Sequence, residues 1–279
     1  MKNVKRIMLI ACYFGELPWY TDFFVHSCGF NSSIDFTIIT DNIYNSPLPE
    51  NVKLLKMTRE EFEKLASSQL SLKIEFQDSY KLCDFKPAYG LILSSLIDGY
   101  DFWGHCDIDI ILGDIRAFIT DNILDKYDLI SVRADWLTGC FLIYRNTDRV
   151  NTLFRQSKDY EKVFTSTKHY CFDETNFRHR DFSSGKNYFE VDSEIESMMH
   201  VVQKMESKEY IKCHFDHFII EGRPGKLNWE NGKLFYKNEF EVLLYHMIHF
   251  KNHCKKKKIN MPPKKFNISA QNLYNLKFY

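Results

Sequence analysis

Two aspartates, Asp107 and Asp109, are the residues best placed to do chemistry, and they lie in the segment 103–114 (WGHCDIDIILGD). If the strand before them continues, the alternation of side chains along a strand places both carboxylates on one face. Mg²⁺ and Mn²⁺ prefer oxygen ligands of this kind and keep open positions for a diphosphate. A chance Asp-x-Asp at a strand end is the alternative. The apolar neighbours favour a metal, because a buried carboxylate is costly unless it is paired or bound to a cation.

The elements that must position these aspartates are those of an α/β sheet. Short apolar runs alternate with helical segments over the first two thirds of the chain. The predicted strands cover 4–13, 35–40, 52–57, 102–111, 129–133 and 141–144, and the predicted helices cover 18–28, 58–69, 79–98 and 147–164. This alternation predicts right-handed βαβ units and a mostly parallel sheet covered on both faces. Ligands of such sheets bind beyond the carboxyl ends of the strands.

Local signals define two of these elements and a small β-rich C-terminal extension. Thr58 and Glu61 form a capping-box pattern at the start of the helix 58–69. Pro87 must begin or kink the helix 79–98. In the segment 227–236, Asn231-Gly232 predicts a hairpin with a two-residue turn, and 241–250 predicts a further strand. We expect one α/β domain at 1–250, followed by a basic and aromatic tail at 251–279.

Composition limits the possible partners. The 279 residues carry 37 basic and 37 acidic side chains, so no nucleic-acid binding is expected of the molecule as a whole. Residues 251–265 hold seven lysines and no acid, and aromatic residues follow them. Such a tail predicts attraction to an anionic membrane surface, with a solvated charge run as the alternative. The apolar run near the N-terminus predicts a buried strand rather than a signal peptide. We therefore expect a cytoplasmic protein, peripheral on the inner face of the cytoplasmic membrane.

Four motifs, taken in order, resemble those of the GT-A-type nucleotide-sugar glycosyltransferases. The closer resemblance is to glycosyltransferase-like proteins of bacterial polysaccharide gene clusters, which share the pattern YKLCDFKPAYG at 80–90, and the more distant one is to glycosyltransferase family 8. The motifs are the DxD at 107–109, LTGCFLIYRN at 137–146, FDETN at 172–176 and HFKNHCK at 249–255. The resemblance implies the GT-A (Rossmann-like) fold and Mn²⁺ or Mg²⁺ as cofactor. In the second motif Leu137 stands where the family has an Asn that contacts the donor sugar.

The resemblance also implies a metal site and a place for the diphosphate. His249 would join Asp107 and Asp109 as a metal ligand, and Lys255 would contact the diphosphate. His246 is three residues earlier, so on a strand it would face the other side. A histidine of the core or of a hairpin is the alternative for His249.

Two acidic residues, Asp173 and Glu174, are the catalytic candidates. They match the segment that the family places beneath the anomeric carbon, and Glu174 stands where the family has Gln. The alternative is an acidic pair that only offsets the dipole of a helix.

Five further positions are expected to bind the nucleotide sugar. Ala11 and Tyr13 end the first predicted strand, where the resemblance places the base and ribose, and Tyr13 could stack on uracil. Asp41 ends the second strand, a usual position for a ribose or base contact, with a turn-forming role as the alternative. Asp84 would bind sugar hydroxyls and Lys86 a phosphate. A helix cap and a solvated lysine are the alternatives for these two.

The expected function is transfer of a hexosyl unit from a UDP-sugar to a glycan or lipid-linked glycan of a bacterial surface polymer such as capsule, O-antigen or lipooligosaccharide. Lys86 and Lys255 would add positive charge around the leaving diphosphate. Family 8 implies retention of configuration, whereas Glu174 acting as a base from the opposite face would invert it. One alternative is a sugar-phosphate nucleotidyltransferase, which the sequence YFGELPWY at 13–20 disfavours because it is not a Gly-rich basic loop. The other is a non-catalytic, glycosyltransferase-like binding protein.

Overall fold

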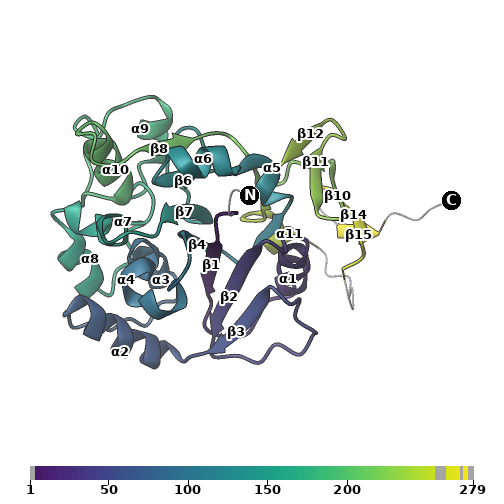
Figure 1. Ribbon diagram of the computed structural model, residues 1–279, viewed down its shortest axis with the longest axis horizontal. Helices are drawn as coiled ribbons and strands as arrows, with labels where there is room; N and C mark the ends of the chain where they lie inside the picture. The colour runs from purple at the N-terminus through teal and green to yellow at the C-terminus, as the bar shows by residue number, and fades with distance from the viewer. Residues whose placement is uncertain (1–3, 255–261, 271–272, 276–279) are drawn as a thin grey trace.

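A seven-stranded sheet forms the centre of the computed structural model (Figure 1), which describes residues 4–254, 262–270 and 273–275. Within these residues the strand order is β3-β2-β1-β4-β7-β6-β8, and all strand pairs are parallel except the two that β7 makes. The strands are β1 (Ile7–Cys12), β2 (Ile34–Thr40), β3 (Val52–Lys56), β4 (Phe102–Cys106), β6 (Leu129–Ser131), β7 (Phe141–Arg145) and β8 (Cys213–Phe215). The predicted α/β class with a mostly parallel sheet is confirmed.

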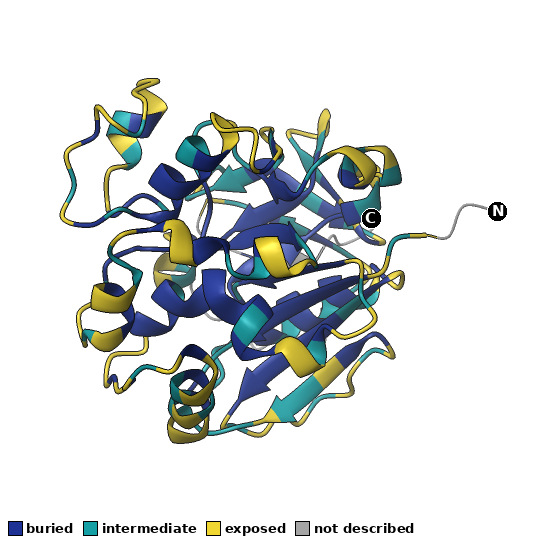
Figure 2. Ribbon diagram, turned by 60° about the vertical axis from the view of Figure 1, so that its left-hand side comes forward, coloured by how far each residue is buried: buried dark blue, intermediate teal, exposed yellow. Residues whose placement is uncertain are grey.

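Both faces of this sheet are covered. Leu9 of β1 packs into the core shared with Phe24 of α1, whereas its neighbour Ile10 packs into the core shared with Phe62 of α2. Figure 2 shows the central strands as buried, with the exposed residues on the outer turns of the flanking helices. The helices and 3₁₀ turns of the described residues are α1 (Thr21–Gly29), α2 (Arg59–Leu70), α3 (Lys81–Phe85), η1 (Lys86–Ala88), α4 (Tyr89–Ile92), η2 (Ser94–Leu96), α5 (Ile115–Phe118), α6 (Asp121–Lys126), α7 (Asp148–Asn151), η3 (Leu153–Gln156), α8 (Tyr160–Thr165), α9 (His179–Ser183), α10 (Met198–Glu206) and α11 (Phe250–His253).

Two local predictions are confirmed. The Thr58 hydroxyl accepts a hydrogen bond from the Glu61 N–H at 3.1 Å, and a Glu61 carboxylate oxygen accepts one from the Thr58 N–H at 2.7 Å, so the capping box is complete. The hairpin turn joins β10 (Leu227–Glu230) to β11 (Lys233–Tyr236). Asn231 and Gly232 have φ angles of 48° and 86°, as the tight turn of a hairpin requires.

The two long predicted helices are wrong as single elements. The segment 79–98 divides into α3, η1, α4 and η2, because Pro87 has no N–H and cannot continue the helix of the preceding turn. The segment 147–164 divides into α7, η3 and α8. There the Ser157 hydroxyl accepts a hydrogen bond from the Asp159 N–H at 3.2 Å, a local contact that competes with helical bonding.

The predicted strand 102–111 is also two strands, and this break creates the candidate site. β4 stays in the central sheet, whereas β5 (Ile110–Leu112) belongs to a three-stranded sheet with β13 (Leu244–His246) and β9 (Ile219–Glu221). Asp107 and Asp109 therefore lie in the turn between two sheets and not on one face of one strand. After β5 the backbone passes very close to the segment around Val242. A Cβ on Gly113 would lie 2.6 Å from the Val242 carbonyl oxygen, so only glycine fits there.

A five-stranded antiparallel sheet, to the right in Figure 1, forms the predicted β-rich C-terminal extension. Its order is β12-β11-β10-β14-β15, with β12 (Phe240–Val242), β14 (Lys265–Ile268) and β15 (Leu273–Asn275). Residues 255–261, with four of the tail lysines, lie outside the described residues. The division of the chain at residue 250 and the membrane role of the tail stay predictions. In the described part of the chain, no helix combines the length and apolar character needed to cross a lipid bilayer.

We expect Phe266→Ala to destabilise the protein by about 3–5 kcal/mol, the usual effect of removing a buried phenyl ring. Phe266 is fully buried, stacks on Trp229 with ring centroids 5.0 Å apart and meets Phe23 edge-on at 5.2 Å. The measurement is urea unfolding. Phe240→Ala, in the same sheet but at a side chain that is 53% exposed, is the control and should change the stability by no more than about 0.5 kcal/mol. Equal effects of the two variants would contradict a structural role of β14.

Candidate active site

A buried lysine joins three segments at the carboxyl edge of the central sheet. Lys86 Nζ donates to Asp107 Oδ1 at 2.6 Å and to the Gly139 carbonyl oxygen at 2.8 Å, and it lies 3.7 Å from Asp173 Oδ2. Lys86 comes from η1, Asp107 follows β4, Gly139 precedes β7 and Asp173 follows α8. Burial disfavours the charged form of Lys86, but the two aspartates outweigh burial and hold its pKa well above the usual range. A positive charge is therefore built into this edge.

The second aspartate has a different set of partners. Asp109 Oδ2 lies 2.7 Å from Lys251 Nζ and 3.5 Å from His246 Nε2. The antiparallel pairing of β5 with β13 sets Ile110 opposite His246, which brings the imidazole to Asp109. Burial raises the pKa of Asp109, but His246 and Lys251 together bring it below the usual range. Asp109 is thus a carboxylate held between two cationic groups.

Three side chains at this point could hold a metal ion. Asp107, Asp109 and His246 each offer one ligand atom, and these atoms lie within 4.8 Å of one another. Two carboxylates and one imidazole suit Mn²⁺ and related divalent cations. Lys86 engages one oxygen of Asp107, and Lys251 has a side chain that is 22% exposed, so it has space to move away from Asp109. The residues present therefore fit a divalent metal.

The histidine of this group is His246, and not the predicted His249. β13 ends at His246, and His249 is an exposed residue at the N-cap of α11. The alternation of a strand therefore does not extend to residue 249. Lys255, the predicted diphosphate contact, lies outside the described residues. Lys251 is the lysine that the structure brings to Asp109, and the sequence analysis did not predict this contact.

The two candidate catalytic carboxyls have opposite environments. Burial raises the pKa of Asp173 well above its usual range, although Lys86 is nearby. Burial also acts on Glu174, but His179 Nε2 at 2.7 Å and the Gly139 N–H at 2.5 Å lower its pKa to about 2. Neighbouring carboxyls whose pKa values are pushed apart are a common basis for acid and base roles. Gly139 has to be glycine, since a Cβ there would lie 2.4 Å from Asp173 Oδ2.

The segment that carries this pair has a strained backbone. Cys171, Asn176 and Phe177 have φ angles of 53°, 52° and 61°, in the left-handed region that side chains disfavour. Such conformations persist only where the surroundings enforce them, and they cluster at functional sites.

Asp84 enforces part of this conformation through buried contacts with the loop. Its two carboxylate oxygens accept hydrogen bonds from the N–H groups of Tyr170 and Phe172 at 2.9 and 2.8 Å, and Lys81 Nζ donates to it at 2.9 Å. Asp84 is fully buried, so the predicted contact with sugar hydroxyls does not fit its position. Its place in the structure is to anchor the loop that precedes Asp173.

The predicted nucleotide-binding residues lie at the ends of β1 and β2. Ala11 is buried in the core, whereas Tyr13 is half-buried. Burial raises the pKa of the Tyr13 hydroxyl, and the charges of Lys251 and Asp109 also act on it. Asp41 is exposed, and its Oδ1 accepts a hydrogen bond from the Gly15 N–H at 2.8 Å. This contact ties the loop after β1 to the end of β2.

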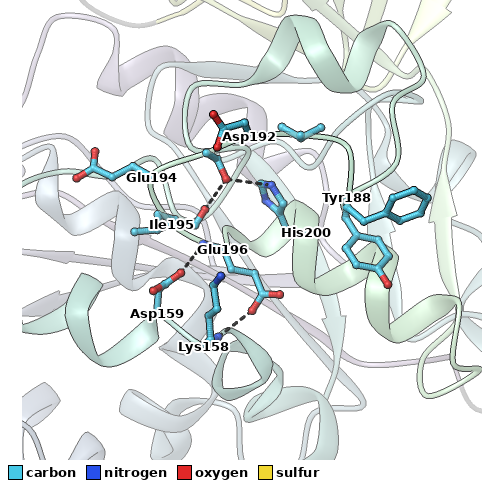
Figure 3. A pocket seen from close by; sticks show the side chains of 11 residues that line it. Lys158, Asp159, Tyr188, Asp192, Glu194, Ile195, Glu196 and His200 are labelled. Atoms are coloured by element: carbon cyan, nitrogen blue, oxygen red, sulfur yellow. Dashed lines mark hydrogen bonds between the residues drawn. The ribbon is translucent and has the colours of Figure 1, made fainter.

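A separate pocket shares no lining residue with this edge of the sheet (Figure 3). It is lined by Lys158, Asp159, His200 and residues between 188 and 196. Two of its carboxylates hold the loop itself, since Asp159 accepts a hydrogen bond from the Glu196 N–H at 2.7 Å and Glu196 accepts one from the Lys158 N–H at 2.8 Å. We assign no function to it.

Comparison with protein families shows to which family the chain belongs. Residues 9–277 match DUF6625, a family of unknown function. The chain belongs to this family. Membership in DUF6625 assigns no activity. None of the curated proteins matches the sequence.

Among solved structures, this DUF6625 member is similar to a crystal structure of the galactosyltransferase LgtC in complex with donor and acceptor sugar analogs. The TM-score is 0.35 and the sequence identity is 9%. The match covers 58% of this chain and 66% of the LgtC chain, slightly less than two thirds of it. Likeness at this level carries no information about activity, which has to be argued from the site itself.

We expect Lys86→Met to destabilise the protein by about 3–5 kcal/mol, because it leaves Asp107 and Asp173 without the buried ammonium that compensates them. The measurement is chemical unfolding at neutral pH. Lys168→Met is the matched control, since the ion pair of Lys168 with Glu194 is exposed, and it should cause a much smaller loss. Equal losses for the two variants would show that Lys86 does not hold these segments together.

Proposed function

We propose that this protein is a metal-dependent glycosyltransferase that moves a hexosyl unit from a UDP-sugar to a glycan or lipid-linked glycan of a bacterial surface polymer. One observation carries the proposal: Asp107, Asp109 and His246 lie together at the carboxyl edge of an α/β sheet, where ligands of such sheets bind. The DxD resemblance of the sequence supports the same assignment. The reaction type is argued from these residues and not from the likeness to LgtC.

The metal ligands in this proposal are Asp107, Asp109 and His246. A bound Mn²⁺ or Mg²⁺ would neutralise the negative charge on a departing nucleoside diphosphate. Lys251 Nζ lies 2.7 Å from Asp109 Oδ2 and neutralises this carboxylate. If a metal ion shared the carboxylate, the ammonium group of Lys251 would need another anionic partner. The diphosphate supplies one. Lys86 adds fixed positive charge on the other side of Asp107.

Tyr13 and Asp41 would bind the nucleoside. Tyr13 is half-buried after the end of β1, and its hydroxyl feels the charges of Lys251 and Asp109, so its ring would stack on a base bound at this edge of the sheet. Asp41 is exposed at the end of β2, where a carboxylate can accept hydrogen bonds from ribose hydroxyls. Ala11 contributes only its backbone, because its side chain is in the core.

Glu174 is the better of the two catalytic candidates. Its side chain is 23% exposed, whereas Asp173 is almost completely buried beside Lys86. The lowered pKa of Glu174, about 2, keeps it ionised at neutral pH, as stabilisation of an oxocarbenium-like centre requires. In the inverting alternative Glu174 would act as a base toward an acceptor hydroxyl, and the lowered pKa disfavours that role because such a carboxylate holds a proton only weakly. Asp173 would act by anchoring Lys86.

A second candidate function has a specific observation in its favour. The pairs Lys86–Asp107 and Lys251–Asp109 already neutralise both aspartates without a metal. A protein that binds a sugar nucleotide without transferring the sugar would retain such pairs. Catalysis has to be tested directly.

The test is a panel of nucleotide sugars scored for release of UDP with and without Mn²⁺. We expect hydrolysis of at least one UDP-sugar in the presence of Mn²⁺, and a loss of at least about 100-fold in rate for Asp107→Asn and Asp109→Asn, the scale of losing one electrostatic contact at a leaving group. Asp216→Asn, at an exposed residue that accepts a hydrogen bond only from the next N–H among the described contacts, is the control and should keep full activity.

Three outcomes would contradict parts of the proposal. An active Asp109→Asn variant would remove the metal assignment. Metal-dependent binding of UDP without turnover of any donor would favour the binding protein. Absence of any metal-dependent nucleotide binding would overturn the proposed function.

A further inference from the structure

His246 lies between two carboxylates on opposite sides of its ring. Its Nε2 is 3.5 Å from Asp109 Oδ2, and its Nδ1 is 3.0 Å from Glu221 Oε1. The sheet fixes this arrangement, because β13 pairs in parallel with β9 so that His246 is opposite Glu221. On its other side β13 pairs with β5, which sets His246 opposite Ile110. The imidazole is buried, so it has little freedom to turn.

We propose that Glu221 is a positioning residue that prepares His246 to bind a metal ion; this inference rests on the metal site of the proposed function. A histidine that binds a metal through one ring nitrogen usually donates the N–H of the other nitrogen to a carboxylate or carbonyl. That contact selects the tautomer and fixes the plane of the ring. Here Glu221 accepts from Nδ1–H, and Nε2, on the side of Asp109, is the nitrogen that would bind a metal in place of its proton. Glu221 itself stays out of contact with the metal.

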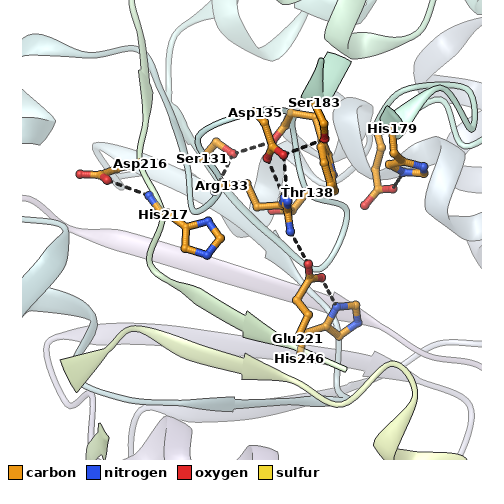
Figure 4. A network of polar contacts seen from close by, with 12 residues as sticks. Ser131, Arg133, Asp135, Thr138, His179, Ser183, Asp216, His217, Glu221 and His246 are labelled. Carbon is orange, nitrogen blue, oxygen red and sulfur yellow. Dashed lines mark hydrogen bonds and ion pairs between the residues drawn. The ribbon is translucent and has the colours of Figure 1, made fainter. Parts of the chain in front are cut away.

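Glu221 is fixed from its other side by an arginine, as Figure 4 shows. Arg133 Nη1 donates to Glu221 Oε2 at 2.5 Å. The same guanidinium donates to both oxygens of Asp135, at 2.8 and 2.9 Å, and Ser183 Oγ donates to Asp135 Oδ2 at 2.8 Å. Both oxygens of Glu221 are therefore engaged, one by the imidazole and one by the guanidinium. A carboxylate held in this way keeps His246 in one orientation.

The network also reaches the catalytic candidate. The Arg133 guanidinium lies 3.5 Å from the ring centroid of Trp136, and the Trp136 ring meets the His179 ring edge-on at 5.3 Å. His179 Nε2 in turn is 2.7 Å from Glu174 Oε2. Arg133 thus connects the histidine of the metal site with the residue that keeps Glu174 ionised. This makes a structural role for Glu221 a serious alternative, which the experiment has to separate from positioning.

The experiment is calorimetric titration of Mn²⁺ into the full-length protein with UDP present, accompanied by thermal melts. We expect Glu221→Ala to weaken Mn²⁺ binding about 10–100-fold, the usual effect of removing the hydrogen-bond partner of a metal-binding histidine. Glu221→Gln should weaken it less, because the amide oxygen still accepts from Nδ1–H, although the amide carries no charge and its NH₂ group loses the hydrogen bond from Arg133. Glu221→Gln also has nearly the same shape, so it keeps the test valid if Glu221→Ala fails to fold.

Asp135→Asn is the matched control. It weakens the other carboxylate partner of Arg133 and does not touch His246, so it should lower the melting temperature without changing Mn²⁺ affinity. Equal loss of Mn²⁺ affinity in Asp135→Asn and the Glu221 variants would assign the effect to general stability and overturn the positioning role. Unchanged Mn²⁺ affinity in both Glu221 variants would overturn it as well, while the metal site of the wild-type protein would stand. A wild-type protein that binds no Mn²⁺ would overturn the inference together with the proposed metal-dependent function.

Discussion

A charged ammonium group with almost no access to water needs acceptors on every side, and Lys86 imposes this requirement on the candidate site. Its acceptors come from the turn after β4, the loop before β7 and the strained loop that carries Asp173. Any fold that buries Lys86 here must bring these three segments together. The close approach leaves no space for a side chain at residue 139, where glycine stands. The part of the site around Asp107, Gly139 and Asp173 therefore follows from the burial of one charge.

The same reasoning explains why the two aspartates of the DxD segment differ. Asp107 is held by Lys86, a buried and fixed cation, whereas Asp109 is held by Lys251 and His246. The protein neutralises its own acidic pair and so can fold before any metal binds. In the proposed function, binding of a divalent cation would be an exchange in which the more exposed Lys251 gives up Asp109. In this account the diphosphate, which brings its own negative charge, favours that exchange.

Features that depend on residues close together in the sequence could be predicted, whereas contacts between distant segments could not. The capping box at Thr58 and the Asn231-Gly232 turn depend on neighbours in sequence, and both form as predicted. The acidic pair at 107–109 was recognised, but the strand there breaks because its second half pairs with β13, from a distant part of the chain. That pairing brings His246, and not His249, to the acidic pair, and the pairing of β13 with β9 places Glu221 opposite His246. No local pattern encodes it, since the register between distant strands is set by packing. The contact of Asp84 with a sugar was wrongly predicted for a similar reason, because the backbone groups that bind Asp84 belong to Tyr170 and Phe172, after α8.

Crystals of the protein grown with Mn²⁺ and UDP would test the account most directly, through an anomalous difference map at the manganese edge. The account predicts one strong peak bonded to oxygens of Asp107 and Asp109 and to Nε2 of His246, with Lys251 moved from Asp109 to the diphosphate. Bound UDP with no peak at these residues, and Lys251 still paired with Asp109, would contradict it.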